Sequence, residues 1–132
     1  MVAHFFDRQD SVNPMNGMII VDEATLTEAF GQLRKREPSF CEFVGDNGFN
    51  LLVGVGREVG CAQYSPTDGS MPYLMATSGK PAKEDRYIEF LMGNTLTPIS
   101  MRYCLPFDMI RMITSHFVKT GEKCNSVEWE EI

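Results

Sequence analysis

Apolar residues recur at helical spacing between Asp22 and Pro38. Thr25 and Glu28 have the spacing of a capping box, which is typical of a helix start. Basic residues at 34–36 favour the negative end of a helix dipole, and Pro38 disfavours helical backbone in the residue before it. The pattern therefore predicts an amphipathic helix of about three turns. Its apolar face carries Leu26, Ala29, Phe30 and Leu33.

A second helical pattern begins at Pro106, because proline suits the first position of a helix. Lys119 and Gly121 indicate its end, since basic side chains favour the last turn and glycine the position after it. We expect Phe117 and Gly121 to be structural anchors. The apolar face consists of Phe107, Ile110, Ile113 and Phe117.

Between and after these helices the period changes to the alternation of β-strands. Turn residues at 46–48, 66–69, 79–81 and 93–94 separate the segments, and such short connections predict antiparallel neighbours. The glycines between Gly54 and Gly60 continue into a strand, which favours a tight hairpin over a nucleotide-binding loop. Pro98 places its strand at an edge or a bulge. The predicted strands are 49–55, 59–64, 73–76, 87–92, 95–103 and 126–130.

These elements predict an α+β fold, an antiparallel β-sheet meander flanked by two amphipathic α-helices. A length of 132 residues suits a single domain, 1–132, and we expect residues 1–17 to be poorly ordered. Charged residues at Asp7, Arg8 and Asp10 interrupt any signal-peptide core, and no apolar run is long enough to span a bilayer. The expected location is the cytoplasm, with no membrane partner.

The net charge of −6 disfavours direct binding to nucleic acid, because that affinity comes from basic groups that displace counterions. A basic protein is the easier partner for an acidic chain. Trp129 alternates with glutamates, which predicts that the ring faces inward as a third structural anchor while the acids face water.

The candidate chemistry is sparse. Four single cysteines without an export signal are expected to stay reduced thiols, and their spacing does not form a zinc site. Cys104 with His116 is the one nucleophile and base pair to consider, and a packed thiol beside a helix-face histidine is the alternative. The carboxylate pairs Glu84–Asp85 and Glu130–Glu131 are interpreted as solvated charge. We therefore expect no catalytic residues, no metal and no cofactor.

Several segments of the chain are similar to one known family. The sequences Leu-Leu-Val-Gly-Val-Gly at 51–56, Tyr-Ile-Glu-Phe at 87–90, His-Phe-Val-Lys-Thr-Gly-Glu at 116–122 and Val-Glu-Trp-Glu at 127–130 resemble the first-numbered immunity protein family of bacterial polymorphic toxin systems. The resemblance covers about 38–130, although Lys123-Cys124 stands where family members often have Arg-Pro. It implies a protein that protects the producing cell by binding a secreted toxin, commonly a nucleic-acid deaminase.

The leading hypothesis is therefore a non-enzymatic antitoxin that forms a heterodimer with the C-terminal domain of its cognate toxin. Two alternatives remain open, a secretion chaperone or adaptor for an effector and a small cysteine-dependent enzyme. Turn acids with nearby aromatic residues have the composition of an interface hot spot and its rim. The toxin-interface candidates are Asp46, Tyr64, Asp68, Met71, Tyr73, Glu84 and Asp85.

Overall fold

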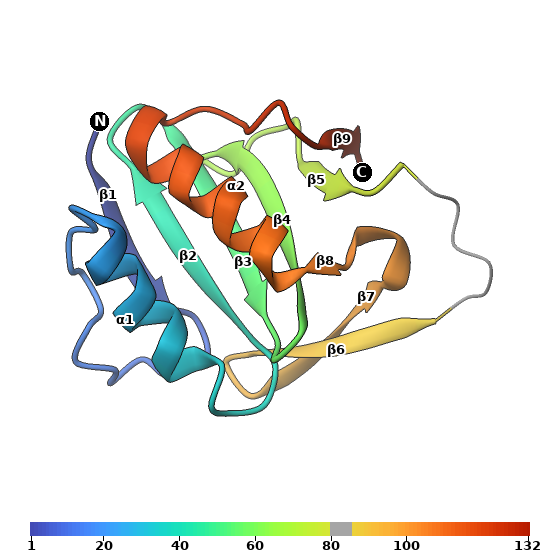
Figure 1. The fold of residues 1–132 in the computed structure, drawn as a ribbon, viewed down its shortest axis with the longest axis horizontal. Helices are drawn as coiled ribbons and strands as arrows, with labels where there is room; N and C mark the ends of the chain where they lie inside the picture. Colours follow the sequence, from blue (N-terminus) through green and yellow to red (C-terminus); the bar gives the residue numbers. More distant parts are fainter. Residues whose placement is uncertain (80–85) are drawn as a thin grey trace.

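The alternating segments form one large curled sheet, with both helices on the same face (Figure 1). The structure is a computed structural model that describes residues 1–79 and 86–132. Its elements in chain order are β1 (Ala3–Asp7), α1 (Glu23–Leu33), β2 (Ser39–Gly45), β3 (Phe49–Val55), β4 (Val59–Pro66), β5 (Leu74–Thr77), β6 (Tyr87–Met92), β7 (Thr95–Ser100), the 3-10 turn η1 (Met101–Tyr103), β8 (Leu105–Pro106), α2 (Phe107–Thr120) and β9 (Glu128–Glu131).

The sheet is mixed, so the predicted antiparallel meander is wrong as a description of the whole. Its order is β7-β6-β2-β3-β4-β5-β9, with β1 also paired to β2 and β8 to β4. The hairpins β3–β4 and β6–β7 are antiparallel as predicted. β2, which was not among the predicted strands, pairs antiparallel with β3 and meets β6 in parallel through Ser39 and Leu91. Turn residues predict which strands share a hairpin. They do not predict that Phe90 packs on Phe40, with ring centroids 5.4 Å apart, beside β2.

Residues 3–7, within the segment 1–17 that was expected to be poorly ordered, form a strand of the sheet. β1 pairs antiparallel with β2 from Ala3 opposite Gly45 to Asp7 opposite Cys41. Phe5 in β1 is fully buried and packs on Phe43, with ring centroids 5.6 Å apart. This strand was not predicted because its stability comes from a partner more than thirty residues away in the chain.

Both predicted helices are confirmed, and α1 starts near Asp22 as expected, although the capping residues differ. Asp22 caps α1 by accepting a hydrogen bond from the Thr25 backbone N–H at 2.8 Å, so the capping residue lies three positions before the predicted one. Pro106 precedes α2 with a non-helical backbone, as its N-cap. Gly121 ends α2 in the left-handed conformation, φ 75°, and its N–H bonds to the Phe117 carbonyl at 2.7 Å.

Two apolar clusters cover the two faces of the sheet. The larger lies between the sheet and the helices and includes Phe30, Phe43 and Phe117. The smaller lies where the β6–β7 hairpin crosses the other face, around Phe40, Cys61, Met75 and Phe90. Gly54 makes this second contact possible, since a Cβ atom there would lie 2.9 Å from the Phe90 ring.

The strand boundaries differ from the predictions by a few residues. The predicted strand 95–103 ends at Ser100, and its last three residues form η1. Pro98 lies in β7 at one end of the strand order, which confirms its predicted edge position. All four cysteines are free thiols, and three of them are buried.

Candidate functional site

Two loops and the segment after α2 meet at one end of the sheet. A backbone hydrogen bond of 2.8 Å joins the β2–β3 turn to the loop between β4 and β5. In the same turn, Asn47 Nδ2 donates to the carbonyl of Gly121 at 2.8 Å. Residues 46–48, 67–73 and 121–124 together are called the loop end below.

Aromatic side chains form the floor of the loop end. The ring of Tyr64 stacks on Phe49 with centroids 4.8 Å apart, and it meets Trp129 edge-on at 6.3 Å. All three rings are half-buried, so part of each faces solvent. The Tyr64 hydroxyl donates to the Gly121 carbonyl at 3.1 Å, which fixes the ring against α2. Rigid, partly exposed aromatic rings are a common centre of protein interfaces.

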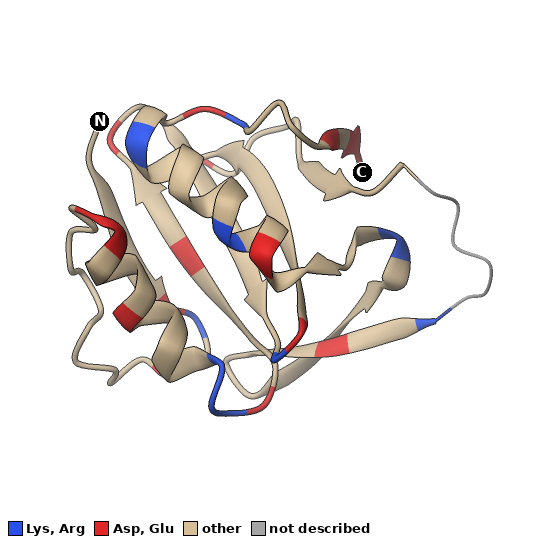
Figure 2. Ribbon diagram, in the orientation of Figure 1, with Lys and Arg blue, Asp and Glu red and all other residues tan. Residues whose placement is uncertain are grey.

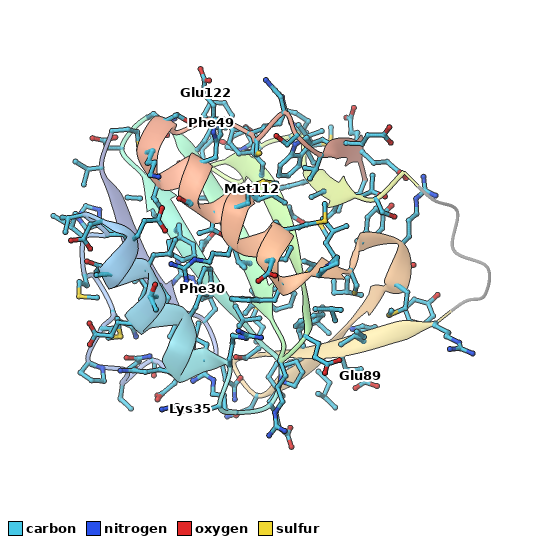
Figure 3. The ribbon with its side chains drawn as sticks, viewed as in Figure 1. Phe30, Lys35, Phe49, Glu89, Met112 and Glu122 are labelled. Atoms are coloured by element: carbon cyan, nitrogen blue, oxygen red, sulfur yellow. The ribbon has the colours of Figure 1, made fainter. Side chains whose placement is uncertain are left out.

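Three exposed carboxylates and Lys123 lie in the loop end. Asp46, Asp68 and Glu122 are exposed, and each lies in one of the three segments of the loop end (Figure 2). Hydrogen bonds from the hydroxyl and backbone N–H of Ser70 lower the pKa of Asp68, so this carboxylate is charged at neutral pH. Glu122 and Phe49 lie at the same end of the molecule in Figure 3. The arrangement suits contact with a positively charged surface.

The predicted interface residues fall largely at this end. Met71 is 72% exposed at the tip of the β4–β5 loop, and the hydroxyl of Tyr73 donates to the Gly69 carbonyl in the same loop. Burial, with the nearby charge of Glu122, raises the pKa of Tyr64. Glu84 and Asp85 lie outside the described residues. The predicted residues in or beside the loop end are Asp46, Tyr64, Asp68, Met71 and Tyr73.

Sequence reasoning did not find Phe49 and Glu122 as members of this surface. Phe49 is the first residue of a strand, and Glu122 follows the end of α2. The local sequence carries no signal for Glu122, because its neighbours at this surface come from distant segments, held there by the hydrogen bond from Asn47 to Gly121. A strand residue next to a predicted turn was the available hint for Phe49.

Of the three expected structural anchors, Gly121 belongs to the loop end, and Phe117 and Trp129 lie beneath it. Phe117 is buried in the main core, and the half-buried Trp129 packs against this core. The Nε1–H of Trp129 donates a hydrogen bond to the Cys124 carbonyl at 2.8 Å. Glu130 differs from the expected solvated acid. It accepts hydrogen bonds from Arg102 Nε at 2.9 Å and from the Tyr103 hydroxyl at 3.0 Å.

Cys104 and His116 are not joined by a hydrogen bond in the part of the chain that the structure describes. Cys104 packs against the smaller cluster, on the opposite face of the sheet from α2, which carries His116. Its Sγ–H donates to the Ser100 carbonyl at 3.6 Å, and burial raises the pKa of its thiol to about 11. A thiol with that pKa is a poor nucleophile at neutral pH.

Within residues 1–79 and 86–132, no three His, Cys, Asp or Glu side chains gather in a way that could hold a metal ion. Neither helix in the described chain has the length and apolar character needed to cross a membrane.

Comparison with protein families gives a match over almost the whole chain. The family described as Immunity protein Imm1 matches residues 2–131. The chain belongs to the Imm1 immunity protein family. This match confirms the resemblance drawn from residues 38–130, and it extends the Imm1 similarity over β1 and α1. A comparison with curated proteins finds no match.

Proposed function

We propose that this Imm1 protein binds the C-terminal domain of a cognate secreted toxin and inhibits it as a one-to-one heterodimer in the cytoplasm of the producing cell. The proposed target is a nucleic-acid deaminase domain that acts on DNA or cytidine, as the sequence resemblance implies. Membership of the Imm1 family supports the immunity role. The loop end supports recognition by surface contact.

The observation that carries this proposal is the presence of three exposed carboxylates, Asp46, Asp68 and Glu122, in the loop end, next to a half-buried aromatic floor. An enzyme that acts on nucleic acid presents a positive cleft to its substrate. An acidic surface with aromatic anchors complements such a cleft, gains fast association by electrostatic steering and excludes the substrate while bound. No bond needs to be made or broken by the inhibitor.

The direct test uses the C-terminal domain of the cognate toxin, which we expect the neighbouring reading frame to encode. We expect the two purified proteins to elute as one heterodimer. Deamination of a single-stranded oligonucleotide by the toxin should fall to background at one equivalent of the Imm1 protein. Absence of a complex at micromolar concentrations of both proteins would refute inhibition by contact.

The role of the loop end is tested by two matched charge reversals. Glu122→Lys changes an exposed acid at the loop end, whereas Glu89→Lys makes the same change on exposed β6, at the opposite end of the molecule in Figure 3. We expect Glu122→Lys to slow association about tenfold at low salt, with a smaller effect at high salt because charges are screened. Equal association rates for both variants would exclude the loop end as the toxin-facing surface.

A further inference from the structure

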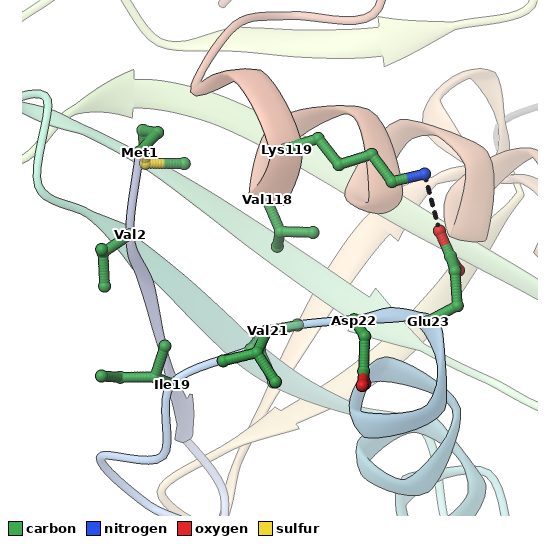
Figure 4. A pocket seen from close by; sticks show the side chains of 9 residues that line it. Met1, Val2, Ile19, Val21, Asp22, Glu23, Val118 and Lys119 are labelled. Atoms are coloured by element: carbon green, nitrogen blue, oxygen red, sulfur yellow. Dashed lines mark ion pairs between the residues drawn. The ribbon is translucent and has the colours of Figure 1, made fainter.

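Exposed apolar side chains gather in a cleft beside β1 (Figure 4). Its walls are residues 1–2, the segment 19–23 and the last turn of α2, and it encloses about 370 Å³. Val21 is 73% exposed and Ile19 is 44% exposed. Single exposed apolar residues are ordinary, but a contiguous group in a hollow is typical of an interaction site. The volume lies in the range of binding pockets and is large enough for one or two apolar side chains.

Hydrogen bonds hold the walls of this cleft in place. The Ile20 N–H donates to the Ala3 carbonyl at 3.0 Å, and the Ile20 side chain is 5% exposed, so its neighbours Ile19 and Val21 point outward. Val2 is fixed by Asp46, whose Oδ1 accepts from the Val2 N–H at 3.0 Å and whose N–H donates to the Val2 carbonyl at 2.9 Å. The cleft is therefore formed before a partner arrives, which reduces the entropic cost of binding.

The rim of the cleft is acidic. Asp22 is exposed at the N-cap of α1, and Asp46 lies beside Val2. Glu23 closes one end of the cleft through an ion pair of 3.0 Å with Lys119, drawn as the dashed line in Figure 4. The cations that line the cleft are Lys119, which is paired with Glu23, and the α-ammonium of Met1. With Asp46 next to Val2, three carboxylates face these two cations.

We propose that this cleft receives one or two large apolar side chains from a basic surface segment of the folded toxin domain, and that it anchors the complex. This inference rests on the proposed function, and it specifies a second contact that the loop end does not supply. Asp46 belongs to the β2–β3 turn of the loop end and also holds Val2 at the cleft. The two surfaces are therefore adjacent, so that one partner can cover both.

The charge balance decides between the possible occupants. A second copy of this chain carries the same net charge of −6 and would bring acidic rims together, which disfavours self-association. A basic protein surface gains favourable electrostatic contact at Asp22 and Asp46 while its apolar side chains fill the hollow. The apolar floor supplies affinity and the acidic rim supplies steering.

The test removes apolar surface without changing charge. The double substitution Ile19→Ser with Val21→Ser removes the apolar side chains from one wall of the cleft. Val118→Ser removes the apolar side chain from the wall on α2. Val12→Ser is the matched control, because Val12 is 82% exposed and does not line the cleft. Binding to the neighbouring gene's toxin domain is measured by calorimetry, after thermal melts show that each variant folds. We expect Kd to rise at least about tenfold for the cleft variants and less than about twofold for the control.

The outcomes separate this inference from the proposed function. If wild-type protein binds the toxin domain and the cleft variants bind equally well, the cleft proposal is wrong and the immunity function stands. If wild-type protein does not bind, both are wrong. If the isolated chain dimerises and only dimerisation responds to the cleft variants, the occupant is a second copy and the proposal is overturned. Hydrogen exchange provides an independent readout, since we expect amides at 19–23 and 118–119 to gain protection in the complex.

Discussion

A buried carboxylate at the end of β1 provides the sharpest test of how the N-terminal segment is held. The Asp7 side chain is fully buried and accepts two hydrogen bonds from Arg36, at 2.8 and 2.7 Å. It also accepts from the Asn13 side chain at 2.9 Å and from the backbone N–H groups of Gln9 and Asp10 at 2.9 and 3.1 Å. Every partner is a donor, so a carboxylate is the group that satisfies them all.

Replacing this carboxylate leaves several donors without an acceptor. Removing one partner of a buried ion pair costs about 3–5 kcal/mol. The Arg36 side chain is 30% exposed, so water can solvate part of its charge, and we expect Asp7→Ala to lower the free energy of unfolding by about 3 kcal/mol. Asp7→Asn is also destabilising, because its amide N–H₂ would face the donors.

The measurement is urea unfolding followed by circular dichroism at pH 7. Asp10→Ala is the control, since Asp10 lies in the same loop and its carboxylate accepts one exposed hydrogen bond, from Val12 N–H at 3.1 Å. We expect this control to change stability by less than about 1 kcal/mol. Equal losses of stability for Asp7→Ala and Asp10→Ala would refute the claim that the buried ion pair between Asp7 and Arg36 holds the N-terminal segment.

The same carboxylate makes stability depend on pH in a stated direction. Burial by itself would raise the pKa of Asp7, but the hydrogen bonds from Arg36, Asn13 and the backbone outweigh it and the pKa is lowered. A group with a depressed pKa in the folded state contributes stability above its unfolded pKa, about 3.9 for aspartate. That contribution is lost as the pH falls below about 4 through the folded pKa. The difference in the free energy of unfolding between wild type and Asp7→Ala should therefore become smaller below about pH 4. A difference that stays constant from pH 7 to pH 2 would contradict this reasoning.

Further predictions concern α1, α2, the aromatic floor and the free thiols. Gly121→Ala should destabilise the protein by about 1 kcal/mol or more, because φ is 75° at this residue. Gly31→Ala, at an exposed position of α1, should stabilise it by about 0.5–1 kcal/mol. Thermal melts of the two variants show whether each change in stability has the expected sign. Trp129→Ala should cost about 3 kcal/mol, the low end of the range for aromatic truncation, since the ring is half-buried; a urea titration that gives no loss would contradict its role as an anchor. Cys104 should react with iodoacetamide very slowly at pH 7.5 and faster towards pH 11, because its thiol has a pKa of about 11, and mass spectrometry of labelled peptides measures the rate.

The amino-acid sequence by itself determines the elements whose signals are local. α2 follows from apolar residues at helical spacing, a proline at its start and Gly121 at its end, because helix hydrogen bonds connect residues four positions apart. The β3–β4 hairpin follows in the same way, since alternation and turn residues lie within one short stretch. The exposed positions of Asp68 and Met71 could be predicted from turn composition, as they lie in the loop that the turn residues predicted.

The tertiary structure decides what depends on distant partners. The parallel contact of β6 with β2, the burial of Phe5 in β1 and the approach of Glu122 to the aromatic floor all join segments that no local period relates. The apolar cleft also depends on segments that are distant in the sequence, since residues 1–2, 19–23 and 118–119 line it together. Ile19 and Val21 become its exposed wall because Ile20 turns inward against β1, and the free energy that selects this arrangement comes from the packed core as a whole.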